Sequence, residues 1–133
     1  MGNAERFGFA IDPAYARILR LFGVRSGTAW VALQGGELRA RFGFWRLSTP
    51  VGNIAGTCVT GPYASAWRAI GPHISLVDHG LSFGTNVERG VCVLFREPVR
   101  GRETLGAVRH PGLTVTVDDV DGLVEAIEGA RAG

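Results

Sequence analysis

"HPGLTVTVDDVDGLVEAI", residues 110–127, decides the fold because its apolar residues change their period part-way along the stretch. Residues 113–117 alternate and are rich in β-branched side chains, as in a strand. Beyond them the apolar residues recur at helical spacing, at Val120, Leu123, Val124 and Ile127. Asp119 stands where a helix N-cap is expected, and Asp121 follows in the first turn. We therefore expect a last strand followed by an amphipathic helix over 118–130, with its acids in solvent and Leu123 and Ile127 facing inward.

Short apolar segments separated by turn signals precede this ending. The Gln34–Glu37 segment contains Gly-Gly, which suits a tight hairpin, and Gly43 interrupts the next segment as a bulge or sharp bend would. The predicted strands are 28–33, 37–49, 54–60, 73–78, 81–85, 90–95 and 113–117. With the closing helix they predict an α+β, mainly β fold, namely a small β-barrel or sandwich of about seven antiparallel strands capped by a C-terminal helix.

An extra strand and helix are expected at the N-terminus. Residues 6–11 alternate apolar side chains, and residues 12–23 have a helical pattern. Asp12 is placed to cap this helix, Pro13 suits its first turn, and Gly23 suits the left-handed position past its end. The side chains expected to face the core are Tyr15, Ile18, Leu19 and Phe22.

The composition is that of one globular domain. The chain has 133 residues, of which 46% are hydrophobic and 20% charged. It contains no linker or repeat, so we expect a single domain with three parts, a strand–helix extension (1–27), a β-barrel (28–117) and the C-terminal helix (118–130). No segment approaches the ~20 apolar residues of a membrane span, and the N-terminal residues lack the layout of a secretory signal. We therefore expect a cytoplasmic protein without a membrane span.

Charge and cysteine content narrow the function classes further. All 14 basic side chains are arginine, and 7 of the 12 acids lie outside residues 118–128, which hold the other five. The excess of arginine elsewhere is smaller than the basic stripe of a nucleic-acid-binding domain, so no nucleic acid is expected. Cys58 and Cys92 lie in apolar runs with neither metal-site nor disulfide-framework spacing. We expect both to be reduced thiols in the core.

Two surfaces are candidates for binding. In "TGPYASAWRAIGPH", residues 60–73, two Gly-Pro pairs interrupt strand pairing, so the residues between them are expected to leave the sheet. Tyr63, Trp67 and Ile70 have helical spacing and are expected to close one end of the barrel. Alternatively, these aromatic residues line the mouth of a pocket whose polar contacts come from Arg68 and His73.

The second surface is the segment from Pro98 to Pro111, which is expected to be an irregular surface connection. It and the residues just before it carry a cluster of basic side chains, Arg96, Arg100, Arg102, Arg109 and His110. Arginine forks bind carboxylates and phosphates in pairs of hydrogen bonds, so an anionic ligand or acidic partner surface is one interpretation. The other is a solvated loop in which Glu97 and Glu103 pair locally with the arginines.

The order of elements, above all residues 110–127, resembles bacterial pleckstrin-homology-like (PH-like) domains, in which a last strand runs into a capped closing helix. "FWRLSTPVGNI" (44–54) is similar to the strand of those domains that leads through a polar turn into an Asn-Ile step. "VTGPY", "LSFGTN" and "RGVCVLF" also resemble an uncharacterised group of actinobacterial proteins of this length. The resemblance runs from about residue 28 to the C-terminus and implies a fold without implying a reaction.

No catalytic, metal or cofactor site is expected. His73 and His79 with Asp78 or Cys92 have no recognised metal spacing, and Ser82 lacks the flanking motif of a catalytic nucleophile. The favoured function is a non-enzymatic binding or scaffold module for an unknown protein or small anionic ligand. The alternative is a small-molecule carrier with an apolar cavity behind Tyr63 and Trp67. Sheet edges also allow a homodimer.

Overall fold

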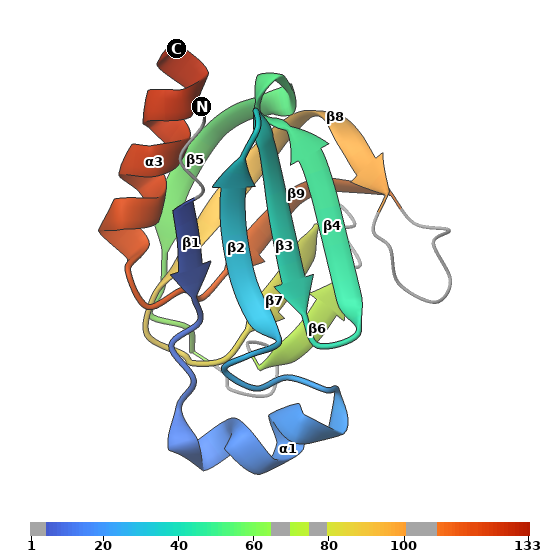
Figure 1. Cartoon of the computed structure of the whole chain (residues 1–133). Helices are drawn as coiled ribbons and strands as arrows, with labels where there is room; N and C mark the ends of the chain where they lie inside the picture. The colour runs from blue at the N-terminus through green and yellow to red at the C-terminus, as the bar shows by residue number, and fades with distance from the viewer. Residues whose placement is uncertain (1–4, 65–69, 75–79, 101–108) are drawn as a thin grey trace.

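The computed structural model describes residues 5–64, 70–74, 80–100 and 109–133. Its strands form two sheets whose inner faces share one core, and a C-terminal helix lies along one side (Figure 1). The fold is thus α+β and mainly β, as the sequence predicted. The sequence left a barrel or a sandwich open, and strand pairing in the described residues gives two sheets that do not close into a barrel.

The first sheet is antiparallel and follows chain order. Its strands are β1 (Glu5–Gly8), β2 (Ala29–Gln34), β3 (Glu37–Phe42) and β4 (Trp45–Pro50). The predicted hairpin joins β2 to β3, with Gly35 and Gly36 both at positive φ. The predicted bend at Gly43 is also present and separates β3 from β4.

The second sheet has the strand order β5-β8-β9-β7-β6. Its strands are β5 (Ile54–Thr60), β6 (Gly71–Ile74), β7 (Leu81–Gly84), β8 (Gly90–Arg100) and β9 (Arg109–Val115), and the short 3-10 helix η2 (Val51–Asn53) leads into it. β7 pairs with β9 in parallel. The sequence predicted about seven strands and an extra N-terminal one. The described residues contain nine, because the bend at Gly43 divides the predicted 37–49 strand into β3 and β4. The prediction that all strands are antiparallel was wrong, because β7 and β9 are parallel.

The C-terminal helix α3 (Val120–Ala132) confirms the prediction made from residues 110–127. The Asp119 carboxylate accepts a hydrogen bond from the Gly122 backbone N–H at 3.0 Å and so caps the helix. Val120, Leu123 and Ile127 are buried. No helix within the described ranges is long and apolar enough to span a membrane.

The strand of the N-terminal extension joins the first sheet, and its helices cover one end of the molecule. β1 pairs with β2, after which η1 (Pro13–Tyr15) and α1 (Ala16–Leu21) cross the end where β2 begins (Figure 1). Asp12 caps the first turn through a 2.9 Å bond to the Ala14 N–H, as predicted. Of the four side chains expected to face the core, Leu19 is fully buried, whereas Ile18 is half-exposed. The helix is too short to bury a complete stripe.

Two further expectations about the second sheet were wrong. β8 continues to Arg100 and β9 begins at Arg109, so much of the predicted irregular connection is strand. Residues 101–108 lie outside the described ranges. Cys58 is exposed and Cys92 half-buried, because both point away from the core on the outer face of the sheet. Apolar runs around a residue do not reveal which face of a strand that residue occupies.

Candidate functional site

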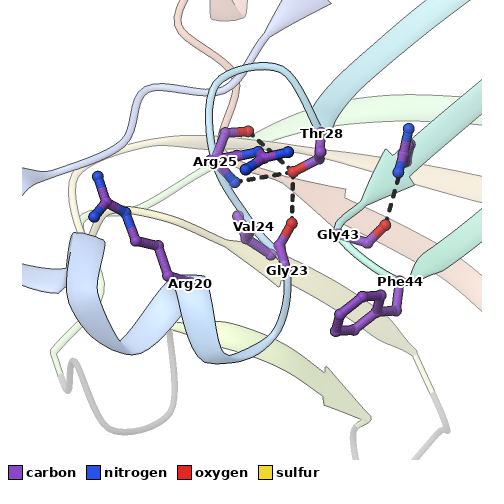
Figure 2. Close-up of a pocket in the computed structure, with 8 residues that line it drawn as sticks. Arg20, Gly23, Val24, Arg25, Thr28, Gly43 and Phe44 are labelled. Atoms are coloured by element: carbon purple, nitrogen blue, oxygen red, sulfur yellow. Dashed lines mark hydrogen bonds between the residues drawn. The ribbon is translucent and has the colours of Figure 1, made fainter.

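A cleft of about 480 Å³ lies where the C-terminal end of α1, the loop that follows it and the β3–β4 turn meet (Figure 2). We call it the arginine cleft, and its lining residues are Arg20, Gly23, Val24, Arg25, Thr28, Arg41, Gly43 and Phe44. Its volume is in the range typical of ligand pockets, about 300–1,000 Å³. Three of its side chains carry a positive charge and none carries a negative charge.

Thr28 holds the loop that forms one wall. Its hydroxyl donates to the Gly23 carbonyl at 2.6 Å and accepts from the Arg25 backbone N–H at 3.0 Å. Its carbonyl accepts from the Gly43 N–H at 2.9 Å, which ties the loop to the β3–β4 turn. These bonds bring Arg25 and Arg41 from separate parts of the sequence to one cleft.

The arginines of the cleft have no acidic partner among the residues that the structure describes. The ion pairs between described residues join Arg39 to Glu37, Arg89 to Asp121, and Arg131 to Glu128. None involves Arg20, Arg25 or Arg41. Arg41 is held by a 3.2 Å bond from its Nε to the Gly43 carbonyl, while Arg20 and Arg25 are exposed. Uncompensated like charges around one cleft repel each other, and an anion bound there removes that repulsion.

Arg41 also belongs to a larger basic surface on the first sheet. Its cross-strand neighbours are Trp30 and Arg46, and the next outward-facing row contains Arg6 and Arg39. These rows alternate with buried residues, so they share the outer face. We call Arg6, Arg39, Arg41 and Arg46 the basic face. Glu37 is the acid beside it, and its carboxylate pairs with Arg39.

Exposed apolar side chains lie on two of the segments that form the cleft. Phe44 lines the cleft and is 70% exposed, and Leu21, at the end of α1, is 79% exposed. The Phe44 ring lies against Gly23, where a Cβ atom would come within 2.9 Å of it. Large exposed apolar residues rimmed by charge are typical of binding surfaces on soluble domains. The cleft therefore offers both charge and apolar area to a ligand.

The first predicted pocket falls largely outside the described residues. Trp67 and Arg68 lie there, and His73 is described only as a backbone position in β6, paired with Ser82 of β7. Tyr63 is half-buried, and its hydroxyl lies 2.5 Å from the Thr60 hydroxyl, with which it forms a hydrogen bond. The predicted cavity behind Tyr63 and Trp67 remains a prediction.

The second predicted patch is divided by the fold. Arg96, Arg100 and Arg109 are exposed, and Arg100 lies opposite Arg109 in the β8–β9 pairing. His110 is fully buried, opposite Val99, and so it does not belong to the surface cluster in which the sequence placed it. Arg102 lies outside the described ranges. Strand alternation separates Arg109 and His110, because neighbouring residues of a strand face opposite sides.

Sequence reasoning did not single out Arg20, Arg25 and Arg41. The available signal was weak, since each is a single arginine with no basic residue directly beside it and the three are spread over 22 positions. No group of three or more histidine, cysteine or acidic side chains in the described part of the chain is arranged to hold a metal ion. Comparisons with protein-family models, curated proteins and solved structures give no match for this chain.

Proposed function

We propose that this protein is a non-enzymatic binding module that recognises an acidic segment of a partner protein through the arginine cleft and the adjoining basic face. The observation that carries the proposal is the cleft itself, which is lined by Arg20, Arg25 and Arg41, none of which pairs with a carboxylate of a described residue. Guanidinium groups bind carboxylates through paired hydrogen bonds, so several side chains from a Glu- or Asp-rich segment match the surface.

The apolar rim favours a protein partner. Arginine and aromatic side chains are the residues that most often dominate binding energy at protein interfaces, and here Phe44 lies beside Arg20 and Arg25. A nucleic acid is disfavoured for two reasons. The formal net charge is only +2, and the Trp30 ring on the basic face is already covered by the Arg6 guanidinium, 4.5 Å from its centroid. That ring face is not open for base stacking.

The architecture supports a binding role as well. A last strand that leads into a capped helix is the ending expected of a PH-like module, and we infer such a relationship from the order of elements. The similarity to PH-like domains concerns the fold alone, and a shared fold does not identify a ligand. The ligand class is inferred from the arginine cleft.

The proposal is tested by titrating the protein into a fluorescently labelled poly-glutamate peptide and following anisotropy at low salt. Reversing two exposed charges, in Arg20→Glu with Arg25→Glu, should weaken binding by about tenfold or more, because attraction becomes repulsion. The matched control reverses two charges in the patch predicted from sequence, Arg96→Glu with Arg100→Glu, and should retain most of the affinity. Circular dichroism confirms that both variants are folded.

Three results would overturn the proposal. Equal losses in the two double variants would mean that net charge alone determines binding. Tighter binding to single-stranded DNA or to anionic lipid vesicles than to the peptide would identify a different class of partner. If neither the native protein nor the control variant binds the peptide, the cleft is not a site for acidic segments.

A further inference from the structure

Cys58 and Cys92 lie directly opposite each other on neighbouring antiparallel strands. Cys58 is on β5, an edge strand of the second sheet, and its register partner on β8 is Cys92. Residues directly opposite in an antiparallel pair point to the same face of the sheet. That face is the outer one, since the flanking Val91 and Val93 of β8 are buried in the core.

The Cα spacing expected for this pairing is compatible with a disulfide. Directly opposite residues in antiparallel strands have Cα atoms about 4.5 or 5.5 Å apart, depending on the type of pair. Disulfides join residues whose Cα atoms are about 4.4–6.8 Å apart, so either type of pair is compatible. The exposure of the two residues differs, because Cys58 is exposed and Cys92 half-buried. The pair therefore has one sulfur that a reagent reaches directly and a second sulfur beside it.

We propose that Cys58 and Cys92 form a redox-active dithiol, which a small-molecule disulfide converts to an intramolecular cross-strand disulfide. The Cys58 thiolate attacks one sulfur of the reagent, whose S–S bond breaks and releases one thiol, leaving a mixed disulfide on Cys58. The Cys92 thiolate then attacks the Cys58 sulfur and displaces the second thiol. The two cysteines lose two electrons and two protons, and the reagent gains them as two thiols.

The residues beside Cys58 and Cys92 on the same face of the sheet are small and polar. The outward row that contains the two cysteines continues through Thr114 of β9 and Ser82 of β7. This inference is independent of the proposed binding function, because the arginine cleft lies on other elements.

Tryptic mapping after treatment with oxidised glutathione tests the proposal directly. Because the chain has no lysine, trypsin cleaves only after arginine and places Cys58 in the peptide 47–68 and Cys92 in the peptide 90–96. The expected product is these two peptides joined, in a monomer whose intact mass is lower by two hydrogen atoms. Dithiothreitol should restore both thiols.

Two cysteine-to-serine variants and the denatured protein serve as controls. Cys92→Ser should stop at a stable mixed disulfide on Cys58, and Cys58→Ser should react more slowly because its remaining thiol is half-buried. In concentrated denaturant, where the strands no longer align the sulfurs, closure of the ring should be slower by about tenfold or more. The proposal is overturned if native protein accumulates only the mixed disulfide, forms Cys58-linked dimers, or closes the ring no faster than denatured protein.

Discussion

Gly43 is the residue on which the shape of the arginine cleft depends. Its φ is +61°, and a Cβ atom built on it would lie 2.1 Å from the Phe22 carbonyl oxygen. The turn therefore approaches the end of α1 as closely as a residue without a side chain permits. This close approach places Arg41 and Phe44, on either side of Gly43, against the loop that carries Arg25.

Replacing Gly43 by alanine should therefore destabilise the protein strongly. The new methyl group must displace backbone atoms in addition to accepting a left-handed conformation, for an expected loss of about 2 kcal/mol or more in unfolding free energy. Gly35→Ala is the matched control, because Gly35 has the same φ of +61° but no atom within 4 Å of the added carbon. It should cost about 1 kcal/mol. Urea denaturation measures both, and equal losses would contradict the close-approach argument.

For single residues, the sequence predicted the backbone conformation better than it predicted which distant residues lie close in space. The bend at Gly43, the cap at Asp12 and the left-handed Gly23 were all predicted, since each depends on the chemistry of one or two residues. The site was not predicted, because Arg20, Arg25 and Arg41 come together through contacts between segments that are distant in sequence, such as the hydrogen bond from the Gly43 N–H to the Thr28 carbonyl. Nothing in the local pattern around any one of these arginines encodes that contact.

Helix α3 is fastened to the edge strand β5 by side chains of its last turns. The Thr57 hydroxyl donates to the Glu128 carboxylate at 2.8 Å, and Glu128 also pairs with Arg131. Arg131 in turn donates to the Ile54 and Ala55 carbonyls at 3.1 and 2.7 Å. The hydrogen bond from Thr57 has the largest effect on the pKa of Glu128 and lowers it. Burial opposes this effect, and the hydrogen bond and charge of Arg131 add to it, so the pKa lies below its ordinary value.

The lowered pKa predicts a pH dependence for this attachment. Since the folded state favours the ionised carboxylate, Glu128 stabilises the fold at pH values above its unfolded pKa, and this contribution is lost as the pH falls through its folded pKa. Glu128→Gln should therefore lower stability at neutral pH and have a shrinking effect in acid. The Glu128 side chain is 41% exposed, so solvent screening limits the effect to a few tenths of a kcal/mol.

Urea midpoints measured from about pH 7 down to pH 3 test this attachment. Glu125→Gln is the control, because Glu125 is exposed on the same helix and forms no ion pair with a described residue. A difference between the two variants that is the same at every pH would exclude the ionised Glu128 contact as its cause.

The sequence predicted an element whose apolar residues recur at a regular spacing, but it did not predict how far a strand extends when its length depends on pairing with another strand. Helix α3 follows from its apolar spacing and its cap, both of which are local. The continuation of β8 to Arg100 was missed because Pro98 suggested a loop. In the structure this proline lies between Leu94 and Val99, where the register of β8 against β9 shifts and a ladder hydrogen bond is not required.

Across the whole molecule, a short aromatic stack joins the two sheets. Phe42 of the first sheet stacks on Phe83 of the second, with ring centroids 4.8 Å apart and planes 7° from parallel, and Phe9 packs against Phe42 at 5.3 Å. All three are buried in the common core. The sequence predicted strands that share a core in either a barrel or a sandwich. It did not predict the parallel pairing of β7 with β9 or decide between closed and open sheets, because neither strand direction nor closure is encoded in local periodicity.

The stack predicts that both sheets unfold as one cooperative unit. Phe83→Leu removes aromatic contact from the second sheet and should cost about 1–2 kcal/mol. In a Trp67→Phe background, the remaining tryptophans are Trp30 and Trp45, which both lie in the first sheet and report on it alone by fluorescence. If the sheets are one unit, Phe83→Leu lowers the fluorescence midpoint as much as the midpoint measured by circular dichroism. A fluorescence midpoint that stays unchanged while circular dichroism shifts would mean that the first sheet is stable without the second.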